Sequence, residues 1–181
     1  MGQPKQLLEI DGQPLIVRTI KAALASAAWP VVVVLGAHAE KIRPAIARLP
    51  ILVVENPAWT EGMAASIRTG VTTLQQFSRA LDAALFALCD QPAFSAEIIG
   101  RILGARVEGG PGIVAAHYSG RNGAPALFGH EYFHELAGLT GEEGARALLN
   151  GEPTKVTAVD LPALALDLDT PEDFAALRQN P

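Results

Sequence analysis

Two aspartates in the chain each follow an apolar run, at the position where a strand would end. Asp90 follows the run at residues 83–88, and Asp169 follows the run at residues 164–168. In proteins, Mg²⁺ favours one or two carboxylates together with phosphate oxygens and water. An aspartate that ends a strand and caps the next turn is a common alternative. The location still favours a metal site, with Asp90 as the first ligand and Asp169 as a candidate second ligand.

A second candidate binding segment spans residues 56–66, from Asn56 to Ser66, between an apolar run and an amphipathic stretch. Gly62 would allow a ligand to approach the backbone closely, and the helix expected after it would present free N–H groups. Ser66 lies one helical turn beyond Gly62 and could face the same ligand. A strand-to-helix connection around a buried tryptophan explains these residues equally well, so both interpretations stay open.

Cations that could hold anionic groups occur in two short segments. Lys5 stands close to Gly2 and Pro4, an arrangement that could direct one positive charge toward a phosphate. A solvated tail explains that segment better when it is taken alone. Arg121 stands in a glycine-containing turn at residues 118–125 and could grip an anionic acceptor. A plain hairpin turn is the alternative for Arg121.

A competing pattern for zinc consists of His130, Glu131 and His134. On a helix the two histidines would share one face, and Glu131 could activate a zinc-bound water. The pattern fixes only three positions, so chance matches are frequent. A third ligand would have to be Glu142 or Glu143. A solvated helix is the better interpretation, and a zinc hydrolase stays open as an alternative.

Short apolar runs alternate with longer amphipathic stretches around these residues. The expected strands lie at residues 31–35, 51–54, 83–88, 113–116, 124–128 and 155–159, and the expected helices at residues 14–28, 39–49, 63–77, 95–106, 141–149 and from Pro171 onward. Strands buried on both faces read as continuous apolar runs, and strands separated by helices are usually parallel. The pattern predicts an α/β protein, a three-layer α/β/α sandwich with a mainly parallel, doubly wound sheet. Ligands bind such sheets at the carboxyl ends of the strands.

The composition limits the classes of protein to which the chain can belong. Its 181 residues are 49% hydrophobic and 18% charged, which excludes general disorder and predicts a single domain over residues 1–181. The formal net charge of −5 gives no general attraction to nucleic acid or to an anionic membrane. No apolar run approaches the length of a membrane span. The single cysteine, Cys89, fits a reducing compartment, so we expect a cytoplasmic protein.

Six segments taken in order resemble the molybdenum-cofactor cytidylyltransferase family, within the broader MobA-like NTP transferases. They are residues 1–8, 56–66, 90–92, 120–125, 141–146 and 167–173, which together extend over essentially the whole chain. Each motif alone is weak, but six in the right order are specific. The resemblance implies a nucleotide-diphospho-sugar transferase-like, Rossmann-like fold. It also implies transfer of CMP from CTP to molybdopterin carrying molybdenum, with release of pyrophosphate.

The resemblance also implies a role for each matching residue. Lys5 and Asp90 would be catalytic, and Asp90 and Asp169 would hold Mg²⁺. Arg121 and Arg146 would lie toward the acceptor. The nucleotide would be bound by Gly2, Lys5, Asn56, Gly62, Ser66 and Asp90. The implied partners are an NTP, with CTP preferred, a phosphorylated pterin acceptor, and a molybdenum hydroxylase client or its chaperone.

The chain departs from the family pattern at three places. The family begins with an apolar strand and a Gly- and Ser-containing loop before the position of Met1. That strand is normally central, so we expect these 181 residues to form an interrupted sheet, to be poorly soluble unless another strand fills the place, and to bind NTP weakly. Ala124 stands where the family usually has His, and Glu142 stands where Asp is usual. Both differences bear on the identity of the acceptor.

Three other functions stay open on the sequence. A GTP-dependent or sugar-phosphate nucleotidyltransferase would share the same fold. The zinc hydrolase would use His130, Glu131 and His134. A catalytically silent protein that binds the nucleotide and delivers a cofactor to a client enzyme would keep the binding residues without turnover.

Overall fold

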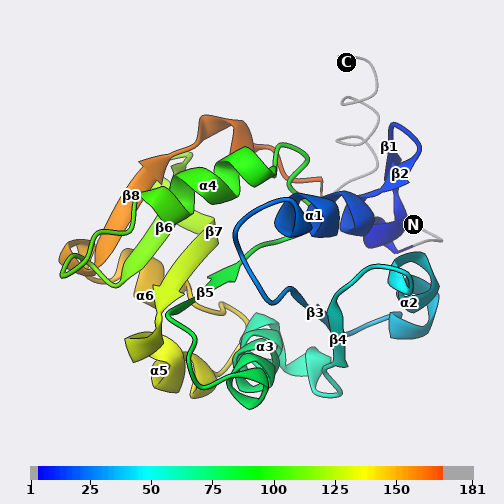
Figure 1. Cartoon of the computed structure of the whole chain (residues 1–181), viewed down its shortest axis with the longest axis horizontal. Coiled ribbons are helices and arrows are strands. Elements are labelled where there is room, and N and C mark those ends of the chain that lie inside the picture. The colour runs from blue at the N-terminus through cyan, green and yellow to red at the C-terminus, as the bar shows by residue number, and fades with distance from the viewer. Residues whose placement is uncertain (1–3, 169–181) are drawn as a thin grey trace.

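The computed structural model describes residues 4–168 and arranges them in three layers (Figure 1). Its strands are β1 (Glu9–Ile10), β2 (Gln13–Pro14), β3 (Val32–Leu35), β4 (Leu52–Glu55), β5 (Ala83–Phe86), β6 (Ile113–Tyr118), β7 (Arg121–Gly129) and β8 (Val156–Asp160). Its α-helices are α1 (Leu15–Leu24), α2 (Ala39–Ile46), α3 (Met63–Phe77), α4 (Ala96–Gly104), α5 (Phe133–Ala137) and α6 (Arg146–Asn150). Five 3₁₀ turns complete the described elements, at Lys5–Leu7, Trp59–Glu61, His130–Tyr132, Pro153–Lys155 and Pro162–Ala165.

The largest sheet has four strands in the order β5-β7-β6-β8. Strands β6 and β8 are parallel, whereas β7 runs antiparallel to both of its neighbours, β5 and β6. Strands β3 and β4 form a separate parallel pair, and β1 and β2 form a short hairpin. The α/β class is therefore confirmed. The expectation of a mainly parallel sheet needs one correction, because β7 makes the four-stranded sheet mixed.

Helices cover both faces of the four-stranded sheet (Figure 1). Ile113 and Ala115 of β6 belong to an apolar cluster with α3, α5 and α6. Val114 and Ala116, which alternate with them along the strand, belong to a second cluster with α4 and the segment around Leu164. Since both faces of β6 are buried, the continuous apolar run in the sequence has a direct physical explanation.

Helix α3 joins the four-stranded sheet to the β3–β4 pair. A Cβ placed on Gly70 would lie 3.4 Å from Cγ2 of Val34 in β3 and 4.0 Å from Cε1 of Phe86 in β5. Within residues 4–168, no strand pairs with the second edge of β3 or with the second edge of β5. The described residues thus form three separate sheets, and the expectation of a missing central strand stays a prediction.

Most predicted elements are present, with differences at their ends. The expected helix at residues 141–149 is reduced to α6, because Gly141 and Gly144 have φ angles of 83° and 60° in the left-handed region. The β1–β2 hairpin has no counterpart in the prediction. The helix expected from Pro171 lies outside the described residues. None of the described helices is long and apolar enough to cross a membrane.

Candidate functional site

An ion pair between Lys5 and Asp90 marks the carboxyl end of β5. Lys5 begins the first 3₁₀ turn, which packs against α1 and α2, and Asp90 lies four residues beyond the last residue of β5, Phe86. The Lys5 Nζ donates to Oδ2 of Asp90 at 2.7 Å, although the two residues are 85 positions apart in the sequence. The structure therefore brings together the two residues that the sequence predicts to be catalytic.

The second carboxylate oxygen of Asp90 is buried. Within the described part of the chain, Oδ1 has no hydrogen-bond partner, and only 16% of the side chain is exposed. A buried carboxylate oxygen without a partner is costly, and a divalent cation would satisfy it. The donor chemistry at Asp90 therefore fits an oxygen-seeking metal ion such as Mg²⁺ or Mn²⁺.

The expected second metal ligand, Asp169, lies outside the described residues, as does Gly2. The chain just before Asp169 nevertheless reaches the site. The backbone N–H of Leu168 donates to the carbonyl oxygen of Asp90 at 2.9 Å. This hydrogen bond places the end of the described chain directly beside the first candidate ligand.

Asp90 also changes the chemistry of its neighbour in the sequence, Cys89. Burial and, to a lesser degree, the negative charge of Asp90 raise the pKa of the Cys89 thiol from 9.0 to about 11, while Lys5 opposes the shift. The thiol is therefore protonated at neutral pH. Cys89 is a poor nucleophile or metal ligand in this state.

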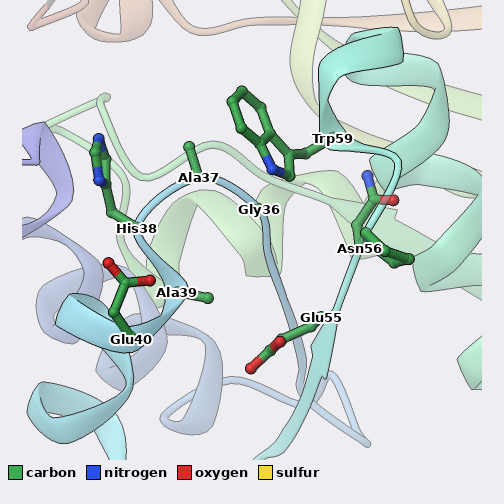
Figure 2. A pocket seen from close by; sticks show the side chains of 9 residues that line it. Gly36, Ala37, His38, Ala39, Glu40, Glu55, Asn56 and Trp59 are labelled. Atoms are coloured by element: carbon green, nitrogen blue, oxygen red, sulfur yellow. The ribbon is translucent and has the colours of Figure 1, made fainter.

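A pocket of about 350 Å³ opens at the carboxyl ends of β3 and β4. It is lined by residues 36–40 and by Glu55, Asn56, Pro57 and Trp59. Figure 2 shows the Trp59 indole beside Ala37, with Glu55 and Asn56 coming from the end of β4. Gly36 is required there, since a Cβ on it would lie 2.8 Å from the Cβ of Trp59. Glu40 and Glu55 contribute carboxylates to the lining, and Glu55 is ion-paired with Arg43.

Asn56 and Ser66, two of the predicted nucleotide-binding residues, are hydrogen-bonded to one another. The Nδ2 of Asn56 donates to Oγ of Ser66 at 3.2 Å, and its Oδ1 accepts from the backbone N–H of Ala58 at 3.0 Å. Asn56 is only 3% exposed. One buried amide therefore ties the end of β4 to the first turns of α3.

Gly62 has a role different from the expected one. Its φ of 101° requires glycine, and a Cβ would lie 2.6 Å from Cα of Glu142. The backbone of Ala64 also donates to the carbonyl of Gly141 at 3.4 Å. In the structure, Gly62 therefore admits the backbone of residues 141–142 at the start of α3, rather than open space for a ligand.

Arg121 and Arg146, the predicted acceptor ligands, lie on adjoining elements. Arg121 opens β7 and Arg146 opens α6, and the two elements pack together. The side chain of Asn150 accepts from the backbone N–H of Asn122 at 3.0 Å, and its Nδ2 donates to the carbonyls of Asn122 and Arg146, both at 3.2 Å. One side chain therefore fixes the backbone beside both arginines.

The zinc pattern is divided between two elements. His130 and Glu131 lie in a 3₁₀ turn, and His134 lies in α5, which begins only at Phe133. The Glu131 carboxylate packs against the backbone of Gly112 and Gly129. Within residues 4–168, no three His, Cys, Asp or Glu side chains gather closely enough to hold a metal.

Sequence reasoning gave no role to Gln91, Tyr118 or Asn150. Gln91 and Tyr118 are hydrogen-bonded at 3.0 Å across 27 positions of sequence. The position of Gln91 directly after Asp90 was a signal that it could contribute to the site. Nothing in the sequence marked Tyr118 or Asn150, because their partners depend on how β6, β7 and α6 pack.

Comparisons with known proteins agree with this geometry. The family model of the MobA-like NTP transferase domain matches residues 1–161. A nicotine blue oxidoreductase of Paenarthrobacter nicotinovorans is 30% identical over 185 residues, which cover 97% of this chain and 85% of the relative.

Solved structures are similar over nearly the full chain. Rv0371C of Mycobacterium tuberculosis H37Rv in complex with manganese is 29% identical with a TM-score of 0.77, covering 99% of this chain and 94% of that one. A nucleotidyl transferase of Methanothermobacter thermautotroptrophicus is 23% identical with a TM-score of 0.79, covering 97% and 83%. The second likeness shows the fold alone.

Proposed function

The chain belongs to the MobA-like NTP transferase family, and we propose that it transfers CMP from CTP to a phosphorylated pterin, molybdopterin carrying molybdenum. Nucleotidyl transfer follows from the family, whereas the choice of CTP and of the acceptor is our proposal. The observation that carries it is the Lys5–Asp90 pair at the end of β5, with a buried Asp90 oxygen available to a cation. The order of the family segments supports the pterin acceptor.

In the proposed reaction, a terminal phosphate oxygen of the acceptor attacks the α-phosphorus of CTP. A new P–O bond forms, the bond between the α-phosphorus and the bridging oxygen breaks, and pyrophosphate leaves with the electron pair. A cation held by Asp90, with Asp169 as the proposed second ligand, would neutralise charge on the triphosphate. Mg²⁺ is the proposed ion, and the manganese complex of Rv0371C supports a divalent metal.

The side chains of this protein would align the two substrates. Lys5 Nζ lies 2.7 Å from the Asp90 carboxylate, so it adds a positive charge where the triphosphate would lie. Arg121 and Arg146, which lie on elements linked by the Asn150 side chain, would bind the anionic acceptor. No covalent intermediate with the protein is required.

The pocket beside Trp59 supports binding of the nucleoside end. The Glu40 carboxylate on its lining is unfavourable to a phosphate, while the Trp59 indole offers an apolar face to a base. The Asn56–Ser66 hydrogen bond leads from this pocket to α3. We therefore place the base and ribose toward residues 56–66 and the triphosphate toward Lys5 and Asp90.

Asp90→Asn tests the proposal with Asp82→Asn as a matched control. Asp82 is exposed and precedes β5 at its opposite end, so its loss should leave turnover within about twofold. Asp90→Asn should lower kcat/KM for CTP by about 100-fold or more, because a charge that holds the metal is lost. The measurement is release of pyrophosphate with CTP, molybdopterin and Mg²⁺ or Mn²⁺. Near-normal turnover of Asp90→Asn would refute the assignment.

A second candidate function comes from the curated relative. That protein is named a nicotine blue oxidoreductase and is 30% identical to this chain. Reduction of nicotine blue by an added electron donor, without release of pyrophosphate from CTP, would favour this candidate. Replacing CTP with GTP in the transfer assay tests the GTP-dependent alternative, which predicts faster release of pyrophosphate from GTP than from CTP.

A further inference from the structure

A buried chain of hydrogen bonds connects the residue after Asp90 to the acceptor side of the site. Gln91 is 2% exposed. Its Nε2 donates to Oη of Tyr118 at 3.0 Å and to the carbonyl of Leu164 at 3.3 Å. The Tyr118 hydroxyl in turn donates to the carbonyl of Ala124 at 3.1 Å.

The direction of each hydrogen bond in this chain is determined by its partners. The carbonyl oxygens of Leu164 and Ala124 can only accept. The Gln91 nitrogen must therefore face Leu164 and Tyr118, and the Tyr118 hydroxyl must accept from Gln91 and donate to Ala124. Burial raises the pKa of Tyr118 above its ordinary value of 10.0, so the hydroxyl keeps its proton at neutral pH.

The chain of hydrogen bonds ends at an irregularity in β7. Ala115 pairs with Ala126, but the next residue, Ala116, pairs with Gly123. Ala124 and the residue after it are therefore extra in β7, which makes a bulge. A Cβ on Gly123 would lie 2.5 Å from Oη of Tyr118, so the glycine allows the tyrosine to lie against the bulge.

The buried amide oxygen of Gln91 lowers the stability of the folded protein. In the described residues its Oε1 is buried with no hydrogen-bond partner, and an unsatisfied buried amide oxygen is unfavourable. An apolar residue of similar size would avoid this cost. The amide nitrogen, with its two partners, is the part of Gln91 that the fold uses.

We propose that Gln91 and Tyr118 are positioning residues that hold residues 121–125, with Arg121, at a fixed distance from Asp90. The inference rests on the proposed function, in which Arg121 binds the acceptor and Asp90 the metal–triphosphate complex. The attacking oxygen must then lie in line with the α-phosphorus. A small displacement of the loop would spoil this alignment without weakening the binding of CTP.

Tyr118→Phe removes one oxygen and tests the proposal against a matched control, Tyr132→Phe. The chain has two tyrosines, and no hydrogen bond of the Tyr132 hydroxyl is found within residues 4–168. For Tyr118→Phe we expect kcat to fall by about tenfold or more, the KM for molybdopterin to rise, and the KM for CTP to stay within about twofold. Tyr132→Phe should match the wild type.

A combined variant tests whether the two residues act as a unit. Gln91→Met breaks the same link from the other end, so Gln91→Met/Tyr118→Phe should lose little more activity than the worse single variant. Losses that multiply would overturn the proposal. Unchanged kcat and acceptor KM in Tyr118→Phe would also overturn it, as would an equal rise in the KM for both substrates.

Amide hydrogen exchange separates failure of this inference from failure of the proposed function. A wild-type protein that releases no pyrophosphate from CTP with molybdopterin refutes the proposed function. Amide exchange at residues 119–126 still tests the hydrogen bond between Tyr118 and Ala124. This exchange should be faster in Tyr118→Phe than in the wild type and in Tyr132→Phe. Equal exchange in the three proteins would overturn the positioning role.

Discussion

Asp90 interacts with three other residues of the chain. Its Oδ2 pairs with Lys5, its backbone carbonyl accepts from Leu168, and its charge raises the pKa of Cys89. Its remaining oxygen is buried without a partner in the described chain. Asp90 therefore contacts the Lys5 ammonium and the backbone of Leu168, and it keeps one oxygen for the proposed metal ion.

Cys89 reports the charge at Asp90. Because burial and Asp90 raise the thiol pKa from 9.0 to about 11, the rate of alkylation by iodoacetamide should rise with a midpoint near pH 11. Asp90→Asn should lower that midpoint, since the second cause of the shift is removed. The measurement is the rate of alkylation between pH 8 and pH 12.

The same pKa shift affects stability with a defined sign. The folded state holds the Cys89 thiol proton more tightly than the unfolded state does. The contribution of this proton to the free energy of unfolding is therefore fully present below pH 9 and is lost as the pH rises through about 11. Cys89→Ala should lack this part of the alkaline loss of stability. If the wild-type protein lost this stability with a midpoint at the ordinary thiol pKa, that result would contradict the burial of Cys89.

Residue types and spacing singled out part of the candidate site. Asp90 was identified from its place after an apolar run and Lys5 only from the family resemblance, and the structure brings the two together. Asn56 and Ser66 were identified, and they are hydrogen-bonded. Gly62 was assigned to ligand approach, whereas its missing side chain admits Glu142, a contact 80 positions away that no local pattern encodes.

At the scale of elements, periodicity predicted the long helix α3 at the observed bounds, Met63–Phe77. The helix expected at residues 95–106 is present as α4, and the side chain of Ser95 caps it by accepting from the N–H of Ile98. The helix at residues 141–149 was predicted too long, because α3 requires a glycine turn there. Apolar runs carry no direction, so they did not predict that β7 is antiparallel, although the hairpin alternative at residues 118–125 is the one that β6 and β7 form.

The docking of residues 141–144 on α3 predicts a large effect of Gly62→Ala. The residue has φ 101° and ψ −168°, a region open essentially to glycine alone, and the new Cβ would meet Glu142 at 2.6 Å. We expect a loss of about 2–5 kcal/mol, the sum of backbone strain of about 1–2 and overpacking of about 1–3 kcal/mol. The measurement is the free energy of unfolding in urea.

Gly109→Ala is the control for backbone strain alone. Gly109 has a φ of 73°, but nothing lies within 4 Å of its added Cβ. It should lose only about 1–2 kcal/mol. An equal loss in the two variants would show that the contact with Glu142 contributes nothing.

At the scale of the molecule, residues of the candidate site come from both the β3–β4 pair and the four-stranded sheet. The pocket at residues 36–40 opens at the carboxyl ends of β3 and β4, and Asp90 lies beyond β5. Helix α3 contacts both sheets through Gly70. The α/β pattern predicted this edge as the ligand side, but it could not predict which loops would meet there.

The most direct test of the central claim follows the α-phosphorus of CTP. With [α-³²P]CTP, Mg²⁺ or Mn²⁺, and molybdopterin, the label should move onto the pterin in wild-type protein, and Asp90→Asn should transfer it about 100-fold more slowly or less. With [γ-³²P]CTP, the label should leave as pyrophosphate. A γ-label on the pterin, an α-label that reaches the pterin without metal, or near-normal transfer of the α-label by Asp90→Asn would contradict the account.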